Sequence, residues 1–176
     1  MEFLELVQKR HSVRSFLDKP VEQSVLLSIL EAGSLAPSAC NIQPWIFIVV
    51  QDAIDREKLK PVYDRPWFIE APVILAVCCD HSISWKRKDG KDYGDIDIAI
   101  AMDHITLAAA EKEIGTCWIG SFNELEARKV LRLPSQIEPV AFTPMGYPAT
   151  NSFTKVRKSL PESLHWGYYG GKKNNS

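Results

Sequence analysis

The sequence of 176 residues lacks the short motifs that identify many nucleotide-binding proteins and metalloproteins. It contains neither Gly-x-Gly-x-x-Gly nor Gly-x-x-x-x-Gly-Lys, which disfavours a Rossmann or a Walker-type phosphate site. The four cysteines, Cys40, Cys78, Cys79 and Cys117, do not have the paired spacing of a zinc site and are too few for a disulfide framework. We therefore expect reduced thiols, no metal and no glycine-rich nucleotide loop.

Excess charge and long apolar runs are also absent. Lys and Arg number 21 and Asp and Glu 22, so no net field draws the chain toward nucleic acid or an acidic membrane. No apolar run reaches the ~18 residues of a membrane span, and the first residues carry acid where a signal peptide would carry base. These features predict a cytoplasmic protein without nucleic-acid or membrane partners. Any anion that it binds must be held by a local cluster of cations.

Two such clusters are present, one near each end of the chain. Arg10, Ser12 and Arg14 follow a predicted helix whose apolar face includes Val7. Two guanidiniums around a hydroxyl suit an anion, but Arg10 also suits the negative end of that helix dipole. These residues alone therefore leave an anion site and plain surface charge as equal alternatives. The second cluster is Lys155–Lys158, and only the fold can bring it to the first.

Hydrophobic periodicity predicts one globular domain of alternating helices and strands. Helices are expected over 25–30, closed by Gly33, and over 53–59, 96–112 and 123–134, and strands over 45–50, 72–79, 116–120 and 140–142, the last bounded by Pro139 and Pro144. The apolar run 72–79 is typical of a strand buried on both faces, so the pattern by itself favours a parallel sheet. Helix 96–112 is apolar nearly all round, which predicts the spine of the core or of a subunit interface.

Two loops and three polar residues need separate explanations. Residues 35–45 carry no charge, so they are either an ordinary connection or a segment lying against a ligand that satisfies its amides. Residues 81–95 are polar and most simply form a solvated loop. Asp97, Asp103 and His104 interrupt the long apolar helix, and we expect them to make structural hydrogen bonds rather than to act in catalysis.

Taken in order, five segments resemble the flavin-dependent nitroreductase family. They are Arg10–Arg14, Pro37–Trp45, Ala71-Pro72, Gly115–Gly120 and Lys155–Arg157. The resemblance implies an α+β fold in which helices flank a mixed, mainly antiparallel central sheet, in place of the parallel sheet that periodicity favours. It also implies an intertwined homodimer with exchanged C-terminal arms. Residues 1–165 would form one FMN-binding domain, with 147–165 as the arm on the partner and 166–176 as a polar tail whose order the sequence leaves open.

The resemblance also implies which residues bind the cofactor. Arg10 and Ser12, with the second basic cluster, would hold the FMN phosphate, because a dianion requires charge-assisted contacts. Arg14 would face the pyrimidine edge of the flavin and tune it, with no catalytic side chain. The uncharged loop would come from the other subunit, and two backbone amides would lie near the nitrogen that accepts hydride. The full implied set is Arg10, His11, Ser12, Arg14, Pro37, Ser38, Ala39, Asn41, Ile119, Gly120, Lys155 and Arg157.

The implied activity is the transfer of two electrons from NAD(P)H to a quinone or nitroaromatic acceptor with ping-pong kinetics. Two departures from larger family members leave the acceptor and the preferred pyridine nucleotide open. Trp67–Glu70 holds no counterpart of their ring-binding Lys or Asn, and their substrate lid is reduced here to residues 81–95. Alternatives are a specialised member such as a reductive dehalogenase, or a non-catalytic FMN-binding or redox-sensing module. Without a flavin, the basic clusters would be surface charge.

Overall fold

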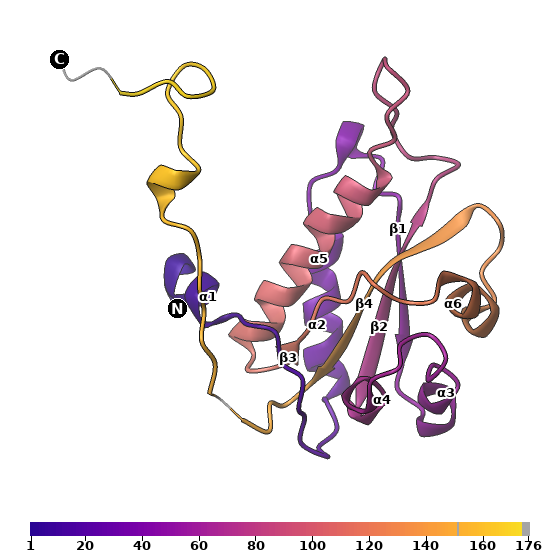
Figure 1. Ribbon diagram of the computed structural model, residues 1–176. Helices are drawn as coiled ribbons and strands as arrows, with labels where there is room; N and C mark the ends of the chain where they lie inside the picture. Colours follow the sequence, from indigo (N-terminus) through magenta and orange to yellow (C-terminus); the bar gives the residue numbers. More distant parts are fainter. Residues whose placement is uncertain (151, 174–176) are drawn as a thin grey trace.

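Four strands form one antiparallel sheet with helices on both faces (Figure 1). The computed structural model describes residues 1–150 and 152–173. The strand order is β1-β2-β4-β3. The strands are β1 (Trp45–Val50), β2 (Val73–Asp80), β3 (Gly115–Thr116) and β4 (Ile137–Gly146), and the helices are α1 (Phe3–Lys9), α2 (Gln23–Ser34), α3 (Ala53–Glu57), α4 (Pro66–Glu70), α5 (Gly94–Glu111) and α6 (Glu124–Leu131), with 3-10 helices η1 (Ala39–Asn41) and η2 (Leu160–Glu162). The predicted α+β class is confirmed, whereas the parallel sheet that periodicity favoured is wrong.

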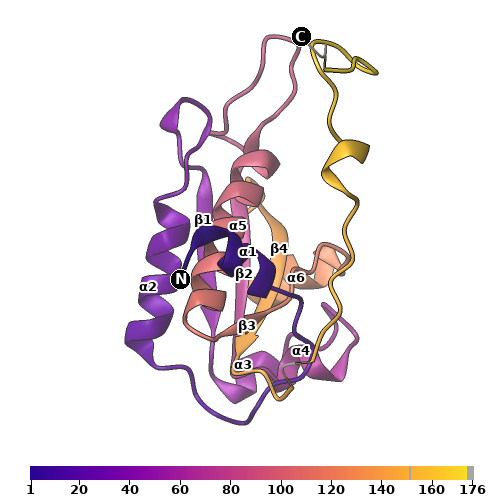
Figure 2. The same cartoon turned by 90° about the vertical axis from the view of Figure 1, so that its left-hand side faces the viewer.

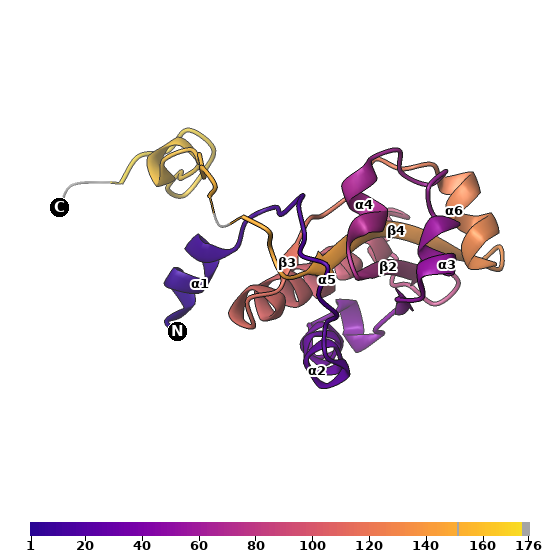
Figure 3. The same ribbon diagram turned by 90° about the horizontal axis from the view of Figure 1, so that it is seen from below.

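Strand β2 lies at the centre and separates two apolar cores. Because side chains alternate along a strand, Leu75 and Val77 face α2 and α5, while Ile74 and Ala76 pack with residues of the opposite face. Figure 3 shows α2 and α5 on one side of the sheet and α3, α4 and α6 on the other. The prediction of a strand buried on both faces is confirmed, although antiparallel neighbours flank it.

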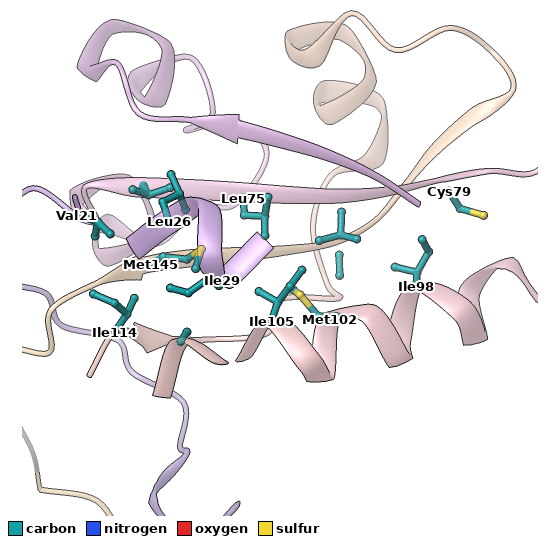
Figure 4. Close-up of a cluster of buried hydrophobic side chains, with 14 residues drawn as sticks. Val21, Leu26, Ile29, Leu75, Cys79, Ile98, Met102, Ile105, Ile114 and Met145 are labelled. Atoms are coloured by element: carbon teal, nitrogen blue, oxygen red, sulfur yellow. The ribbon is translucent and has the colours of Figure 1, made fainter. Parts of the chain in front are cut away.

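Helix α5 is the spine of the first core. Ile98, Met102 and Ile105 point from it toward the sheet, as Figure 4 shows, and all three are fully buried. Gly33 lies inside α2, so the prediction that it closes this helix is wrong. A Cβ on Gly33 would stand 2.5 Å from Ile105 Cγ1, which means that this glycine allows α2 and α5 to approach closely.

Strand β4 is longer than the sequence predicts, because it continues through both prolines that were expected to bound it. A register shift in β2 between Val77 and Cys78 places Pro139 at an irregularity in the ladder, where a missing N–H is tolerated. Strand β3 pairs only with Met145 and Gly146, so Pro144 is not required to donate to it. The strand predicted over 116–120 is shorter than expected, because β3 covers only Gly115–Thr116. The residues after it contact the sheet through an isolated bridge between Ile119 and Phe142.

Helix α1 and the chain around Lys155 lie side by side and project from the sheet (Figures 1 and 2). Helix α1 buries none of its residues, and Phe3 and Leu4 are 65% and 73% exposed. The C-terminal arm also exposes apolar side chains, among them Val156 and Leu160. Residues 166–171 form a turn closed by the Trp166 N–H and the Gly171 carbonyl, while the rest of the predicted tail from 174 lies outside the described residues. No helix in the described ranges is long and apolar enough to cross a membrane.

Candidate functional site

The segment after α1 runs along the edge of the sheet and presents its polar residues outward. The Val13 N–H donates to the Thr116 carbonyl at 2.8 Å, and Ser12 forms a parallel bridge with Thr116. Val13 is buried against Gly115, where a Cβ would meet the Val13 side chain at 2.8 Å. In an extended segment the neighbours of an inward residue face outward, and Ser12 and Arg14 are indeed exposed.

The C-terminal arm runs beside this segment and brings the two basic clusters together. Between them lies a cavity of about 400 Å³. Its lining combines both ends of the chain and consists of Arg10, His11, Ser12, Arg14, Ser152, Phe153, Thr154, Lys155 and Arg157. The fold therefore assembles in one place the groups that the sequence analysis assigned to phosphate binding.

The backbone pairs the start of the arm with the N-terminal segment through the Ala149 N–H and the Ser15 carbonyl, and the side chains of His11 and Lys155 fix the arm further along. The His11 and Phe153 rings stack with centroids 3.8 Å apart and planes 7° from parallel. Lys155 Nζ donates to carbonyls at the end of α1, at 2.9 Å to Arg10 and also to Val7. A helix leaves its last carbonyls without partners, and a cation there satisfies them and opposes the helix dipole. Lys155 thus holds α1 and the arm together while it borders the cavity.

The cations of this cavity are not neutralised. Within residues 1–150 and 152–173, no carboxylate lies within ion-pair distance of Arg10, Arg14, Lys155 or Arg157. Burial, followed by repulsion from Arg10 and Arg157, lowers the pKa of Lys155. Repelling cations around a common cavity, with a hydroxyl among them, match the requirements of a bound dianion.

The chain after β3 carries a thiol and the two backbone amides that the resemblance places near the flavin. The Ile119 N–H donates to the Phe142 carbonyl at 2.8 Å, so it is not free to meet a ligand. The neighbouring Gly120 N–H has no backbone acceptor within the described chain and lies on an exposed residue. Of the two amides expected near the hydride-accepting nitrogen, only that of Gly120 is available. Burial raises the pKa of the Cys117 thiol, which Arg14 and Ser12 partly offset.

The uncharged loop adopts an unusual backbone conformation. Cys40, Asn41 and Gln43 have φ of 50°, 56° and 57°, in the left-handed region. This region costs roughly 1 to 2 kcal/mol for a residue with a Cβ, less for Asn. Two side chains hold the loop: Ser38 Oγ accepts from the Gln43 N–H and Asp97 accepts from the Ala39 N–H, both at 2.9 Å. An ordinary connection does not require such strain, which favours the alternative of a functional loop.

The loop lies beside the first turn of α5, whereas α1, which precedes the cation cavity, lies nearer the other end of that helix (Figure 1). Asp97 contacts the loop from the first turn, whereas Ala110 of the last turn lines a second cavity together with Arg10 and His11. Arg10, Lys155 and Arg157 also line a cavity with Asp103 and Leu107, so the cations face α5 between roughly 9 Å and roughly 20 Å beyond Asp97 along its axis. One chain therefore assembles Arg10, His11, Ser12, Arg14, Lys155 and Arg157 around one cavity, whose lining includes none of Pro37, Ser38, Ala39, Asn41, Ile119 and Gly120.

The structure adds residues that the pattern of the sequence did not assign to the site. Phe153 anchors the arm, and Cys117 lies against Ser12 and Arg14. Asp97 makes a structural hydrogen bond as expected, and its partner Ala39 belongs to the uncharged loop. Its signal in the sequence is a single acid on the apolar face of a buried helix. No set of three His, Cys, Asp or Glu side chains in the described part of the chain is arranged to hold a metal ion.

Comparisons with known proteins show the family of this chain. The nitroreductase family model matches residues 7–65 and 57–147. A Bacillus subtilis protein named FMN reductase [NAD(P)H] is 32% identical over 178 residues, which cover 92% of this chain and 71% of that protein. A Methanothermobacter thermautotrophicus protein that carries the name NADH dehydrogenase/NAD(P)H nitroreductase is 32% identical over 88% of this chain and 82% of its own length.

Solved structures are similar over nearly the whole chain. A nitroreductase family protein from Clostridium difficile 630 superimposes with a TM-score of 0.89 at 33% identity, and the match covers 96% of this chain and 99% of that one. The similarity therefore includes the sheet, the helices on both faces and the N-terminal segment that borders the cation cavity.

Proposed function

Since this chain belongs to the nitroreductase family and is an oxidoreductase of its NAD(P)H nitroreductase and FMN reductase type, we propose that it binds FMN and passes two electrons from NAD(P)H to a quinone or nitroaromatic acceptor. The observation that carries this proposal is the cation cavity. Arg10, Lys155 and Arg157 come from opposite ends of a chain without net positive charge and converge there without a carboxylate partner in the described residues. Such an arrangement costs electrostatic free energy unless an anion occupies it.

The residues present fit the parts of FMN. Arg10, Ser12, Lys155 and Arg157 would hold the phosphate, with His11 keeping the arm in place by its stack on Phe153. Arg14, exposed on the same segment, would stand at the pyrimidine edge, where a guanidinium favours negative charge on the ring. The Gly120 N–H would lie near the hydride-accepting nitrogen, with Ile119 fixing the backbone beside it. Bound FMN supplies the redox chemistry, namely acceptance of hydride and delivery of two electrons.

A second copy of this chain would complete the site. The loop Pro37–Asn41 lines none of the three cavities that Arg10 borders in its own chain, so we infer that it serves the cavity of a partner. The exposed apolar side chains of α1 and of the arm support this inference, because Phe3, Leu4 and Leu160 are left uncovered by their own chain. Exposed apolar surface on this scale is typical of a subunit interface. The arm from 147 to 165 would then pack on the partner.

The visible spectrum and steady-state kinetics of the purified protein test the proposal. A yellow protein that oxidises NAD(P)H with a quinone or nitroaromatic is expected, and varying both substrates should give parallel double-reciprocal lines, because both act in turn at one position. A colourless protein without flavin affinity would refute FMN binding. Flavin binding without turnover would instead indicate a non-catalytic flavin module, and intersecting lines would mean that both substrates bind at once.

A further inference from the structure

Asp97 is a buried acid that flavin binding by the cavity does not explain. It is 1% exposed and lies in the first turn of α5. Asp97 Oδ1 accepts a hydrogen bond from the Ala39 N–H at 2.9 Å, and Asp97 Oδ2 is buried without a hydrogen-bond partner among the described residues. Burying a carboxylate with one oxygen unpartnered costs free energy. Its burial therefore points to a role for the hydrogen bond that the other oxygen makes.

The bond fixes a loop whose backbone needs external support, since three of its residues have positive φ. Ala39 is the first residue of η1, and Cys40 and Asn41 directly after it have positive φ. Two consecutive residues in the left-handed region are intrinsically unfavourable, so this conformation is stable only where contacts with the surrounding structure impose it. The support comes from Asp97 before the pair, and after it from the bond between Ser38 and Gln43. Asp97 therefore determines where Ser38 and Asn41 stand relative to the rest of the fold.

We propose that Asp97 is a positioning residue for the flavin ring bound by a second copy of this chain. It holds the loop 37–41 so that Ser38 and Asn41 reach the ring and ribityl chain, which FMN shares with riboflavin. The proposal rests on the proposed function. Asp97 itself touches no ligand, because its hydrogen bond goes to the loop and its side chain is buried.

Flavin affinity separates this role from that of the cation cavity. Asp97→Ala should weaken FMN and riboflavin equally, by about tenfold, because it removes a contact that positions the shared part of both ligands. Asp97→Asn keeps an acceptor oxygen for the Ala39 N–H and should stay within about threefold of the wild type. Arg10→Ala should weaken FMN alone. Thr106→Ala, a buried polar change whose hydroxyl bonds within α5 to Asp103, controls for loss of stability and should leave both affinities unchanged.

A second variant removes the other partner of the same bond. Ala39→Pro deletes the donor N–H at the first position of a 3-10 helix, and Ser38 before it is already extended, with φ −137° and ψ 160°. Both features favour proline at this position, and the loss of affinity for FMN and riboflavin should match that of Asp97→Ala. If Asp97→Ala fails to fold, Ala39→Pro carries the test. Unchanged affinity for both flavins in the folded variants would overturn the proposal.

Mixed dimers test whether the loop acts on the partner. Arg10→Ala and Asp97→Ala chains with different tags are combined, and the mixed dimer is isolated. One of its two sites then combines an intact cavity from the Asp97→Ala chain with an intact loop from the Arg10→Ala chain. The mixed dimer should bind half as much FMN as the wild-type dimer, at a concentration where each variant homodimer is nearly empty. No recovery would show that each loop serves its own chain, whereas absence of flavin binding by the wild type would refute the proposed function instead.

Discussion

The segment Arg10–Arg14 and the loop Pro37–Asn41 are both expected to meet one cofactor, yet they differ in charge and in backbone. The first presents two guanidiniums in an extended chain joined to the sheet edge through Val13. The second carries no charge, and Cys40 and Asn41 in it have left-handed φ. A phosphate is attracted over several ångströms by charge, so its site tolerates some freedom of position. Hydrogen bonds to a ring depend on short distances, so the loop must be held rigidly.

The sharpest way to break the comparison is to remove the C-terminal arm, which supports only the cation cavity. Deletion of residues 148–176 removes Lys155 and Arg157 and leaves the last carbonyls of α1 without their cation. We expect aggregated or flavin-free protein, measured by size-exclusion chromatography and visible absorbance. Deletion of 166–176 alone is the matched control and should leave a yellow dimer. A monodisperse, yellow monomer from the longer deletion would contradict both the arm assignment and the dimer.

Arg10→Ala has the next largest expected effect, and it distinguishes the phosphate site from the ring site because FMN carries a phosphate and riboflavin does not. Loss of a charge-assisted contact worth about 1.5 to 3 kcal/mol should weaken FMN roughly 10- to 150-fold, with riboflavin nearly unchanged. Titration of flavin fluorescence measures both affinities. Lys88→Ala, which removes an exposed cation from the polar loop, is the control. Equal losses for FMN and riboflavin after Arg10→Ala would place the guanidinium away from the phosphate.

The pH dependence of binding tests the repulsion within the cavity. Burial and the neighbouring Arg10 and Arg157 lower the pKa of Lys155 in the folded protein. Between that lowered value and the unfolded value, the unfolded chain binds more protons, so the stability of the unliganded protein rises with pH. Phosphate remains a dianion above its second pKa of about 6, so FMN affinity should fall a few-fold over the same window while riboflavin affinity stays level.

The measurement for this prediction is the ratio of FMN to riboflavin affinity from about pH 7 to about pH 10, the range in which a depressed lysine loses its proton. Lys155→Arg is the matched control, because its guanidinium keeps its charge throughout. If the ratio of FMN to riboflavin affinity does not change with pH in the wild type, Lys155 binds the carbonyls of α1 but not the phosphate. A sloping ratio in Lys155→Arg would assign the effect to another group.

Arg14→Ala should produce the smallest of these effects on binding, because its expected target is the ring rather than the phosphate. The variant should retain much of its FMN but lower the flavin potential by roughly 30 mV for each 1.4 kcal/mol of lost attraction to the ring. Equilibrium titration against a reference dye measures the potential. Arg14→Lys keeps a cation, so its flavin potential should lie between those of the wild type and of Arg14→Ala. A potential equal to that of the wild type would show that the guanidinium does not face the ring.

Local patterns in the sequence were sufficient for most elements of the fold. The buried strand β2, the apolar helix α5 and the cap of α6, where Asn123 Oδ1 accepts from the Glu126 N–H, all follow from neighbouring residues. The errors concern contacts between distant segments. Strand direction, the passage of β4 through Pro139 and the close approach at Gly33 depend on the partner that packs against each segment.

The same distinction applies to the candidate site. The sequence by itself determined which groups could bind an anion, because charge and hydrogen-bonding capacity belong to Arg10, Lys155 and Arg157 wherever they lie. Only the tertiary structure decided that these residues share a cavity, that the Ile119 amide is already engaged and that Asp97 holds a loop 58 residues away in the chain. Such pairings form when buried surface and satisfied backbone bonds offset the entropy of closing long loops, and no local pattern encodes that balance.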